Sequence, residues 1–255
     1  MIHQCYFLPD QLSLVFRGEP YSPFGLEPRV NAEITKNCPE LESADTRMAL
    51  AEYGAMLHLW RNPELDTDNW IGFTSYRQLT KSAVEFQSKH QVDTLLARGD
   101  YVSWYLWWLG DFKHDGLTGA AAQGEANHPG LHAFIVDMLG AFSIDVPATY
   151  SSAPFAPFAN YWVMSKVMFG RYMDWSWPII GHALTAKHPY ISESSELGSR
   201  DNKSRAIGYF MERLFILWSQ IERLRTVVVG PLYDYTGRAI ESQRLTRLMK
   251  GVTTV

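Results

Sequence analysis

Short apolar runs, spaced along the chain, predict the strands of this protein. Residues 2–8, IHQCYFL, are β-branched and aromatic and precede a Pro-Asp turn, which predicts a first strand. The run WIGF at 70–73 predicts a second, and FANYWVM predicts a strand that ends near Met164. The aromatic run at 101–110, YVSWYLWWLG, fits a buried strand or part of a helix, because periodicity cannot decide so short a run.

Apolar positions at helical spacing fall between these runs. Helices are expected from Ser43 as cap to about Arg61, between Gln78 and His90, over 130–142, from about Ser165 onward, and from Ser204 to about Arg225. Residues 17–42 and the Gly-rich stretch 116–130 are expected to be loops, the second ordering over a ligand. Strands alternating with helices predict a single α/β domain over 1–255, with a helical, basic C-terminal segment from about 204.

Composition narrows the class of partner. The net charge of −4 gives no global attraction to nucleic acid, so none is expected as a ligand. From residue 205 onward there are eight Lys and Arg against four Asp and Glu, which suits an anionic ligand, a bilayer surface or simply a solvated face. Cys5 and Cys38 are too few for a disulfide framework, and the N-terminus does not read as a signal peptide. We therefore expect a cytoplasmic protein, with peripheral contact at the inner face of the membrane left open.

Five motifs in order resemble a known family. They are KN at 36–37, LAEYGAMLHLWRN at 50–62, WIGFTSYRQ at 70–78, FANYWVMSK at 158–166 and RAIGYFMERLFILW at 205–218. Together they resemble the bacterial glycosyltransferase-like family of capsule and O-antigen loci. Members of that family show an acidic residue in a helix ending in Trp, then Gly-x-x-His-Tyr-Arg-Arg, an Asn-rich strand and a Glu-Arg-Leu helix.

The resemblance implies a reduced GT-A fold, which is a Rossmann-like nucleotide-sugar-binding domain. Its twisted mixed sheet would be flanked by helices, with the active site at the carboxyl ends of the strands, where open α/β sheets bind ligands in general. The sequence departs from the family pattern in the central motif, where Ser75 stands for His and Gln78 for the second Arg. The donor sugar and the phosphate contacts are therefore left open.

The stretch after the second strand predicts the donor site. Arg77 offers a planar fork for phosphate oxygens, and Ser75 and Tyr76 offer hydroxyl donors to the charge that develops on a departing nucleotide. The alternative is that Tyr76 packs and Arg77 forms an ordinary ion pair. Glu52 is a candidate for a ribose or base edge, or else an exposed helix carboxylate. Arg213 is either phosphate-facing or structural.

Glu212 is the candidate catalytic base. It lies in the apolar stretch YFMERLFILW, where a buried carboxylate needs a partner or a function. An inverting sugar transfer needs one base to take the proton of the acceptor hydroxyl. Gly208, one helical turn earlier, would leave room beside the carboxylate, and Arg205 could keep it ionised. The alternative is a buried Glu212 that pairs with an arginine to lock the helix.

The segment FANYW is the candidate sugar or acceptor site. The Asn160 amide can bind sugar hydroxyls or cap its own loop. Tyr161 and Trp162 both offer a stacking face, but neighbouring residues of a strand point to opposite faces, so at most one of them can serve the site.

No metal site is expected. Asp66 and Asp68 form an Asp-x-Asp pattern, but it precedes the strand instead of following it, so we interpret it as a solvated loop. Asp111, His114 and Asp115 form a weaker alternative. The favoured hypothesis is an enzyme without a cofactor and independent of metal, in which Arg77 offsets the phosphate charge; a divalent cation is the alternative.

These observations predict a glycosyltransferase in bacterial surface polysaccharide assembly. It would use a nucleotide-sugar, with UDP as the expected nucleotide, and a growing glycan as acceptor, which could be lipid-linked. Inverting transfer with Glu212 as base is favoured, with a retaining transferase on the same fold or a non-catalytic carbohydrate-binding module as alternatives. The donor sugar, linkage, acceptor and oligomeric state do not follow from the sequence.

Overall fold

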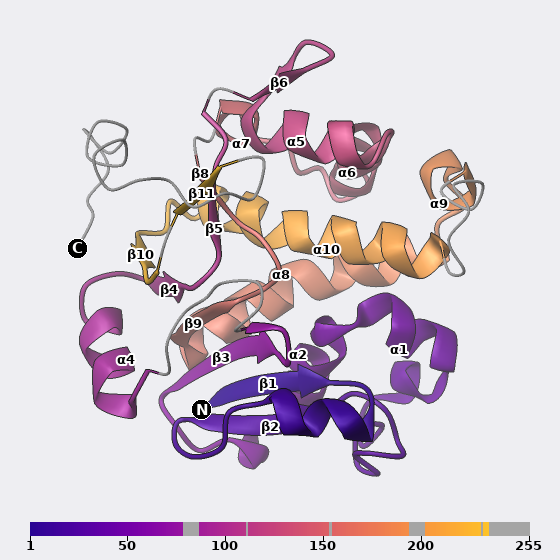
Figure 1. Cartoon of the computed structure of the whole chain (residues 1–255). Coiled ribbons are helices and arrows are strands. Elements are labelled where there is room, and N and C mark those ends of the chain that lie inside the picture. The colour runs from indigo at the N-terminus through magenta and orange to yellow at the C-terminus, as the bar shows by residue number, and fades with distance from the viewer. Residues whose placement is uncertain (79–86, 111, 153–154, 194–201, 231, 235–255) are drawn as a thin grey trace.

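A six-stranded mixed sheet forms the centre of the protein (Figure 1). The computed structural model describes residues 1–78, 87–110, 112–152, 155–193, 202–230 and 232–234. In spatial order the strands are β2 (Tyr21–Gly25), β1 (Ile2–Tyr6), β3 (Trp70–Ser75), β9 (Trp162–Ser165), β4 (Tyr101–Ser103) and β10 (Thr226–Val228). Only β9 runs antiparallel to its neighbours in this sheet. The carboxyl ends of the other five strands therefore share one edge with the amino end of β9.

Two smaller sheets and a set of helices complete the described fold. One sheet joins β11 (Leu232–Asp234), β5 (Leu106–Trp108) and β8 (Phe155–Pro157), and the other is the hairpin of β6 (Lys113–His114) and β7 (Leu117–Thr118). The α-helices are α1 (Ala44–Leu50), α2 (Glu52–Arg61), α4 (Lys89–Leu96), α5 (Gly119–Asn127), α6 (Leu131–Gly140), α7 (Ala148–Ser152), α8 (Lys166–Thr185), α9 (Pro189–Glu193) and α10 (Asn202–Ile221). Short 3₁₀ turns are η1 (Pro9–Leu14), η2 (Pro39–Glu42) and η3 (Pro63–Leu65). None of the helices among the described residues is long and apolar enough to span a membrane.

Aromatic side chains hold the sheet to the long helices. The ring of Trp162 on β9 stacks on Phe215 of α10 with centroids 5.0 Å apart, and it meets Phe73 of β3 edge to face at 5.2 Å. The next residue back along the chain, Tyr161, belongs to the apolar cluster on the other face, together with Val92 of α4. Helices thus cover both faces of the sheet, and α10 lies between the sheet and the α5–α7 group (Figure 1).

Most of the expected elements are present. β1, β3, β9, α6, α8 and α10 occupy the predicted positions, and the expected cap at Ser43 is confirmed, because its Oγ accepts a hydrogen bond from the Thr46 N–H at 3.4 Å. The run 101–110 is strand and not helix: it holds β4 and β5. The expected helix between Gln78 and His90 lies largely outside the described residues.

Three expectations were wrong. The helix from Ser43 to Arg61 is two helices, because Ala51 adopts φ of 46° and breaks the hydrogen-bond ladder. Residues 17–42 contain β2, which pairs with β1. The stretch 116–130, expected as a loop, contains α5, whose small side chains are buried against neighbouring elements. Ala and Gly give little hydrophobic periodicity in the sequence, so the pattern did not predict this helix. Close packing of these small residues against their neighbours stabilises it.

The expected basic C-terminal segment begins within α10. That helix ends at Ile221, and β10 and β11 follow it. Residues 235–255 lie outside the described part of the chain.

Candidate active site

Several of the residues singled out by sequence lie close together at the shared edge of the sheet. Ser75 ends β3, Tyr161 immediately precedes β9, and Glu52 begins α2. The backbone N–H of Tyr76 donates to the Cys5 carbonyl at 3.0 Å, which continues the pairing of β1 and β3 beyond the last strand residue. This edge is the position at which open α/β sheets bind ligands.

A buried hydrogen bond joins β3 to β9 at this edge. The hydroxyl groups of Ser75 and Tyr161 are bonded to each other, and the two side chains are 2% and 1% exposed. Ser75 Oγ also accepts from the Arg77 backbone N–H at 3.2 Å, which closes the turn after β3. Ser75 therefore holds the turn in place but is itself shielded from solvent. A ligand would contact the residues of the turn, such as Arg77, and not Ser75.

Arg77 is the exposed cation of the turn. Its guanidinium lies 5.4 Å from the centroid of the Tyr76 ring, and its Nε donates to Tyr76 Oη at 3.0 Å. Gln78 is buried, and its Oε1 accepts from Gln4 Nε2 of β1 at 3.3 Å. Gln78 is thus held inside the fold, while Arg77 faces solvent.

Two carboxylates from different helices act on Tyr161. Burial raises the pKa of its hydroxyl well above the usual range, and the negative charge of Glu52 and then of Glu212 contributes in the same direction. Both acidic side chains therefore lie within electrostatic reach of one buried hydroxyl. Glu52 is at the N-terminus of α2, where the helix dipole favours a negative charge.

Glu212 is more accessible than its sequence environment indicated. Its side chain is 29% exposed, which corrects the expectation of a carboxylate buried among apolar residues. α10 is amphipathic at this position, so the carboxylate leaves the core while Phe215 remains within it. A methyl group at Gly208, one turn earlier, would meet no heavy atom of the described residues within 4 Å apart from its chain neighbours and the nearby backbone of α10, in agreement with the expected room there.

Arg213 is buried between α10 and α5. It is 2% exposed, its Nη2 donates to Gln123 Oε1, and its guanidinium lies 4.2 Å from the centroid of the Phe158 ring. Its Nη1 is 3.9 Å from Glu212 Oε2. Nε and Nη1 have no hydrogen-bond partner among the described residues. These contacts favour the structural alternative for Arg213 over phosphate binding.

The α5 side of this cluster was not identified from the sequence. Arg213 packs where Gly124 has no side chain, since a methyl group there would lie 3.3 Å from Nε. The ring of His128 stacks on Tyr209 with centroids 3.4 Å apart. Burial, helped by the charge of Arg213, lowers the pKa of His128 to about 4. Gly124 and His128 lie in the segment expected as a loop, so their approach to α10 had no sequence signal.

The FANYW segment divides between edge and core. Ala159 and Asn160 have φ of 66° and 52°, a left-handed pair that turns the chain into β9. Asn160 Oδ1 is buried and has no hydrogen-bond partner in the described part of the chain. Trp162 is fully buried in the core, so the sugar-stacking role expected for it is not supported. Tyr161 reaches the edge only through its hydroxyl.

Asp66 and Asp68 lie at the opposite, amino end of β3. Asp66 is not solvated as expected: it is 7% exposed, it bonds to His3 Nε2 at 2.9 Å, and its carboxylate lies 3.3 Å from Lys166 Nζ. Asp68 pairs with Lys89.

The weaker alternative for a metal site is only partly described. Asp111 lies outside the described residues, while His114 and Asp115 lie 3.5 Å apart. The described residues contain no group of three or more His, Cys, Asp and Glu side chains that could hold a metal ion.

Comparison with known proteins identifies the fold. No protein-family model matches this chain, and no curated protein matches it. A solved structure described as "WbbM bifunctional glycosytransferase apo structure" matches with a TM-score of 0.52 over 90% of this chain, at 14% sequence identity. The match spans 44% of that protein, so this chain corresponds to less than half of it. The chain thus shares the mixed α/β fold of part of a bifunctional glycosyltransferase.

Proposed function

We propose that this chain is a glycosyltransferase that moves a sugar from a nucleotide-sugar to a hydroxyl group of a glycan. The observation that carries the proposal is the convergence of Arg77, Glu52 and Glu212 around the Ser75–Tyr161 hydrogen bond at the carboxyl edge of the sheet. The fold shared with part of a bifunctional glycosyltransferase supports it. The motif resemblance suggests a GT-A type domain and a role in bacterial surface polysaccharide assembly.

In the proposed reaction Glu212 is the general base. The acceptor hydroxyl passes its proton to the Glu212 carboxylate while its oxygen attacks the anomeric carbon of the donor. The bond from that carbon to the phosphate oxygen breaks, and the nucleoside diphosphate leaves with the electron pair. Attack opposite to the leaving group inverts the anomeric centre. The partial exposure of Glu212 and the open space at Gly208 support access of an acceptor to this carboxylate.

The turn after β3 would stabilise the leaving group. Arg77 is an exposed guanidinium at the end of a buried strand, and it can pair with two oxygens of a pyrophosphate. Ser75 and Tyr76 fix the turn that carries it. Glu52 would contact the ribose or base, and the unpartnered Asn160 Oδ1 would accept from a sugar hydroxyl. Arg213 would orient Glu212 from inside the helix pair.

We further propose UDP as the nucleotide and transfer without a metal ion. In this proposal the positive charge of Arg77 takes the place of a divalent cation in offsetting the pyrophosphate. A divalent cation held by Glu52 and the donor is the competing arrangement.

A thermal-shift experiment tests donor binding, because a ligand that binds only the folded state raises its apparent stability. UDP, GDP, TDP and their sugar conjugates are compared in Mn²⁺ and in EDTA. A rise in Tm with UDP or a UDP-sugar that persists in EDTA is expected. A rise only in Mn²⁺ would overturn metal independence, and no rise with any nucleotide would favour a carbohydrate-binding module.

A further inference from the structure

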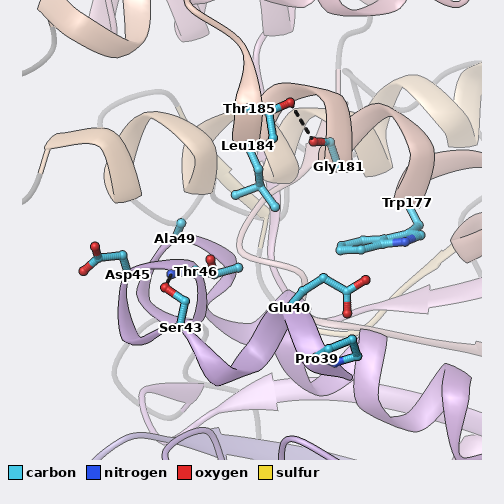
Figure 2. Close-up of a pocket in the computed structure, with 10 residues that line it drawn as sticks. All are labelled: Pro39, Glu40, Ser43, Asp45, Thr46, Ala49, Trp177, Gly181, Leu184 and Thr185. Atoms are coloured by element: carbon cyan, nitrogen blue, oxygen red, sulfur yellow. Dashed lines mark hydrogen bonds between the residues drawn. The ribbon is translucent and has the colours of Figure 1, made fainter. Parts of the chain in front are cut away.

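A pocket lies between η2 with α1 and the C-terminal half of α8 (Figure 2). It encloses about 680 Å³, within the range of roughly 300–1,000 Å³ typical of small-molecule sites. The residues that line it are Pro39, Glu40, Ser43, Asp45, Thr46, Ala49, Trp177, Gly181, Leu184 and Thr185. None of them is among the candidate active-site residues named above.

An aromatic ring and a carboxylate lie together at one end of the pocket. In Figure 2 the indole of Trp177 lies next to the carboxylate of Glu40, with Asp45 toward the other end. Arg61 fixes both: its guanidinium lies 5.4 Å from the centroid of the Trp177 ring, and its Nη2 donates to Glu40 Oε1 at 2.7 Å. Because both Arg61 Nη atoms bond to Glu40, that carboxylate is held in one orientation.

The charge of the lining indicates which ligands fit. Glu40 and Asp45 are acidic, and none of the ten lining residues is basic. A phosphate or a nucleotide-sugar would therefore meet repulsion without a free cation to offset it. The hydrogen bonds from Arg61 keep the pKa of Glu40 below its usual range, so the carboxylate is an acceptor at neutral pH. Each of its oxygens retains a further lone pair for a ligand hydroxyl.

The remaining lining is amphipathic. Ala49, Leu184 and the indole of Trp177 are apolar, while Ser43, Thr46 and Thr185 contribute hydroxyl groups. Ser43 Oγ already accepts from the Thr46 N–H at 3.4 Å, so its own proton remains available to donate. A pyranose has the matching chemistry, with one apolar face of C–H groups and a rim of hydroxyls. Its apolar face would cover part of the indole surface, as polar-edged ligands do on aromatic side chains.

We propose that this pocket binds an uncharged pyranoside, with the sugar ring stacked on Trp177 and its hydroxyls bonded to Glu40. It would thus be a carbohydrate site separate from the donor site, suited to a neutral part of a glycan. The proposal concerns binding alone, so it stands or falls independently of the transfer reaction.

Two glycines on α8 provide a matched pair of variants. A methyl group at Gly181, which lines the pocket, or at Gly170, which does not, would meet no heavy atom of the described residues within 4 Å apart from its chain neighbours and the nearby backbone of its own helix. Gly181→Leu should therefore fill the pocket without a clash, and Gly170→Leu should add the same side chain to the same helix elsewhere. Both changes replace glycine in a helix, so loss of folding is not the expected result.

Binding is followed by NMR on protein labelled with ¹⁵N-tryptophan. The indole N–H resonance of Trp177 is identified with Trp177→Phe, and methyl glucosides, galactosides and mannosides of both anomers are titrated, with UDP and choline as comparison ligands. We expect a saturable shift of this resonance with at least one glycoside. Gly181→Leu should weaken that binding about tenfold or more, and Gly170→Leu should leave it within about twofold.

Three results would overturn the proposal. They are the absence of a saturable shift with every glycoside, a shift that Gly181→Leu leaves unchanged, and a shift produced by choline but by no glycoside, which would make the pocket a cation site. If the protein turned over no nucleotide-sugar but the Trp177 resonance still shifted with a glycoside, the proposed transfer reaction would be refuted and the carbohydrate site would be supported.

Discussion

The two ends of β3 have opposite chemistry. At the amino end, Asp66 is buried and its carboxylate is bonded to His3 and paired with Lys166. At the carboxyl end, Arg77 reaches solvent, Glu212 is partly exposed, and a buried oxygen of Asn160 lacks a hydrogen-bond partner among the described residues. The carboxylate at the amino end is buried, whereas the charged side chains at the carboxyl end are fully or partly exposed.

This difference separates stability from function. Buried charges that are paired within the fold hold elements together, and removing one partner strands the other. Exposed charged groups at a sheet edge can instead contact a ligand. Asp66 of the Asp-x-Asp pattern, which looks like a metal motif, belongs to the first class, and the exposed Arg77 belongs to the second.

The largest expected effect comes from removing the buried charge at the amino end of β3. Asp66→Asn should lower the free energy of unfolding by about 3 kcal/mol, because His3 and Lys166 lose the buried carboxylate that they share. Asp68→Asn, at a side chain that is 21% exposed, should cost less than about 1 kcal/mol. Urea unfolding of both variants measures the difference. Equal losses would show that Asp66 is not the structural member of the pair.

The second prediction concerns the carboxyl end. Arg77→Ala should weaken UDP binding about tenfold or more, since a hydrogen bond to a charged group contributes roughly 1.5–3 kcal/mol. The free energy of unfolding should change by less than about 0.5 kcal/mol, because the side chain is exposed. Calorimetric titration with UDP measures the affinity. Arg98→Ala, at another exposed arginine, is the control, and equal weakening by the two variants would refute a specific contact.

The third prediction tests the link between β3 and β9. Tyr161→Phe should destabilise the protein by about 1–2 kcal/mol, because the buried Ser75 hydroxyl loses a partner. Tyr76→Phe removes a hydroxyl that accepts a hydrogen bond from the exposed Arg77. It should lower the free energy of unfolding by less than about 0.5 kcal/mol. Thermal unfolding distinguishes them. A stable Tyr161→Phe would mean that this bond does not join the strands energetically.

The smallest expected effect is a pH dependence. The pKa of His128 is lowered to about 4 in the folded protein, whereas an unfolded histidine titrates near 6.5. Between these values the unfolded state binds more protons, so stability should fall as the pH drops from 6.5 toward 4. His128→Asn should flatten this part of the profile. Because the ring is only partly buried, solvent screening keeps the effect small. An unchanged profile would contradict the assignment.

Sequence patterns were sufficient to predict those elements that depend on neighbouring residues in the chain. The apolar run before Thr74, the cap at Ser43 and the helix α10 each depend on neighbours within a few residues, and all three are present. Strand ends at one edge follow from the α/β pattern, which made Ser75 a candidate, while Glu52 became one through the motif resemblance.

The rest depends on contacts that are distant in sequence. Ser75 and Tyr161 are 86 residues apart, and nothing in either motif predicts their hydrogen bond. The break at Ala51 uses a left-handed conformation without glycine, so it carries no turn signal. Arg213 packs closely against α5 where Gly124 lacks a side chain, and the pocket beside Trp177 combines residues from three separate elements.

The central claim is that Glu212 takes the proton of an acceptor hydroxyl, and its most direct test is turnover by Glu212→Gln. Transfer is assayed by release of the nucleoside diphosphate from the nucleotide-sugar that raises Tm, with donor affinity measured in parallel. The account predicts a loss of about 10²–10⁴-fold in kcat with donor affinity and Tm unchanged. Turnover at the wild-type rate would contradict it and would return Glu212 to a structural role beside Arg213.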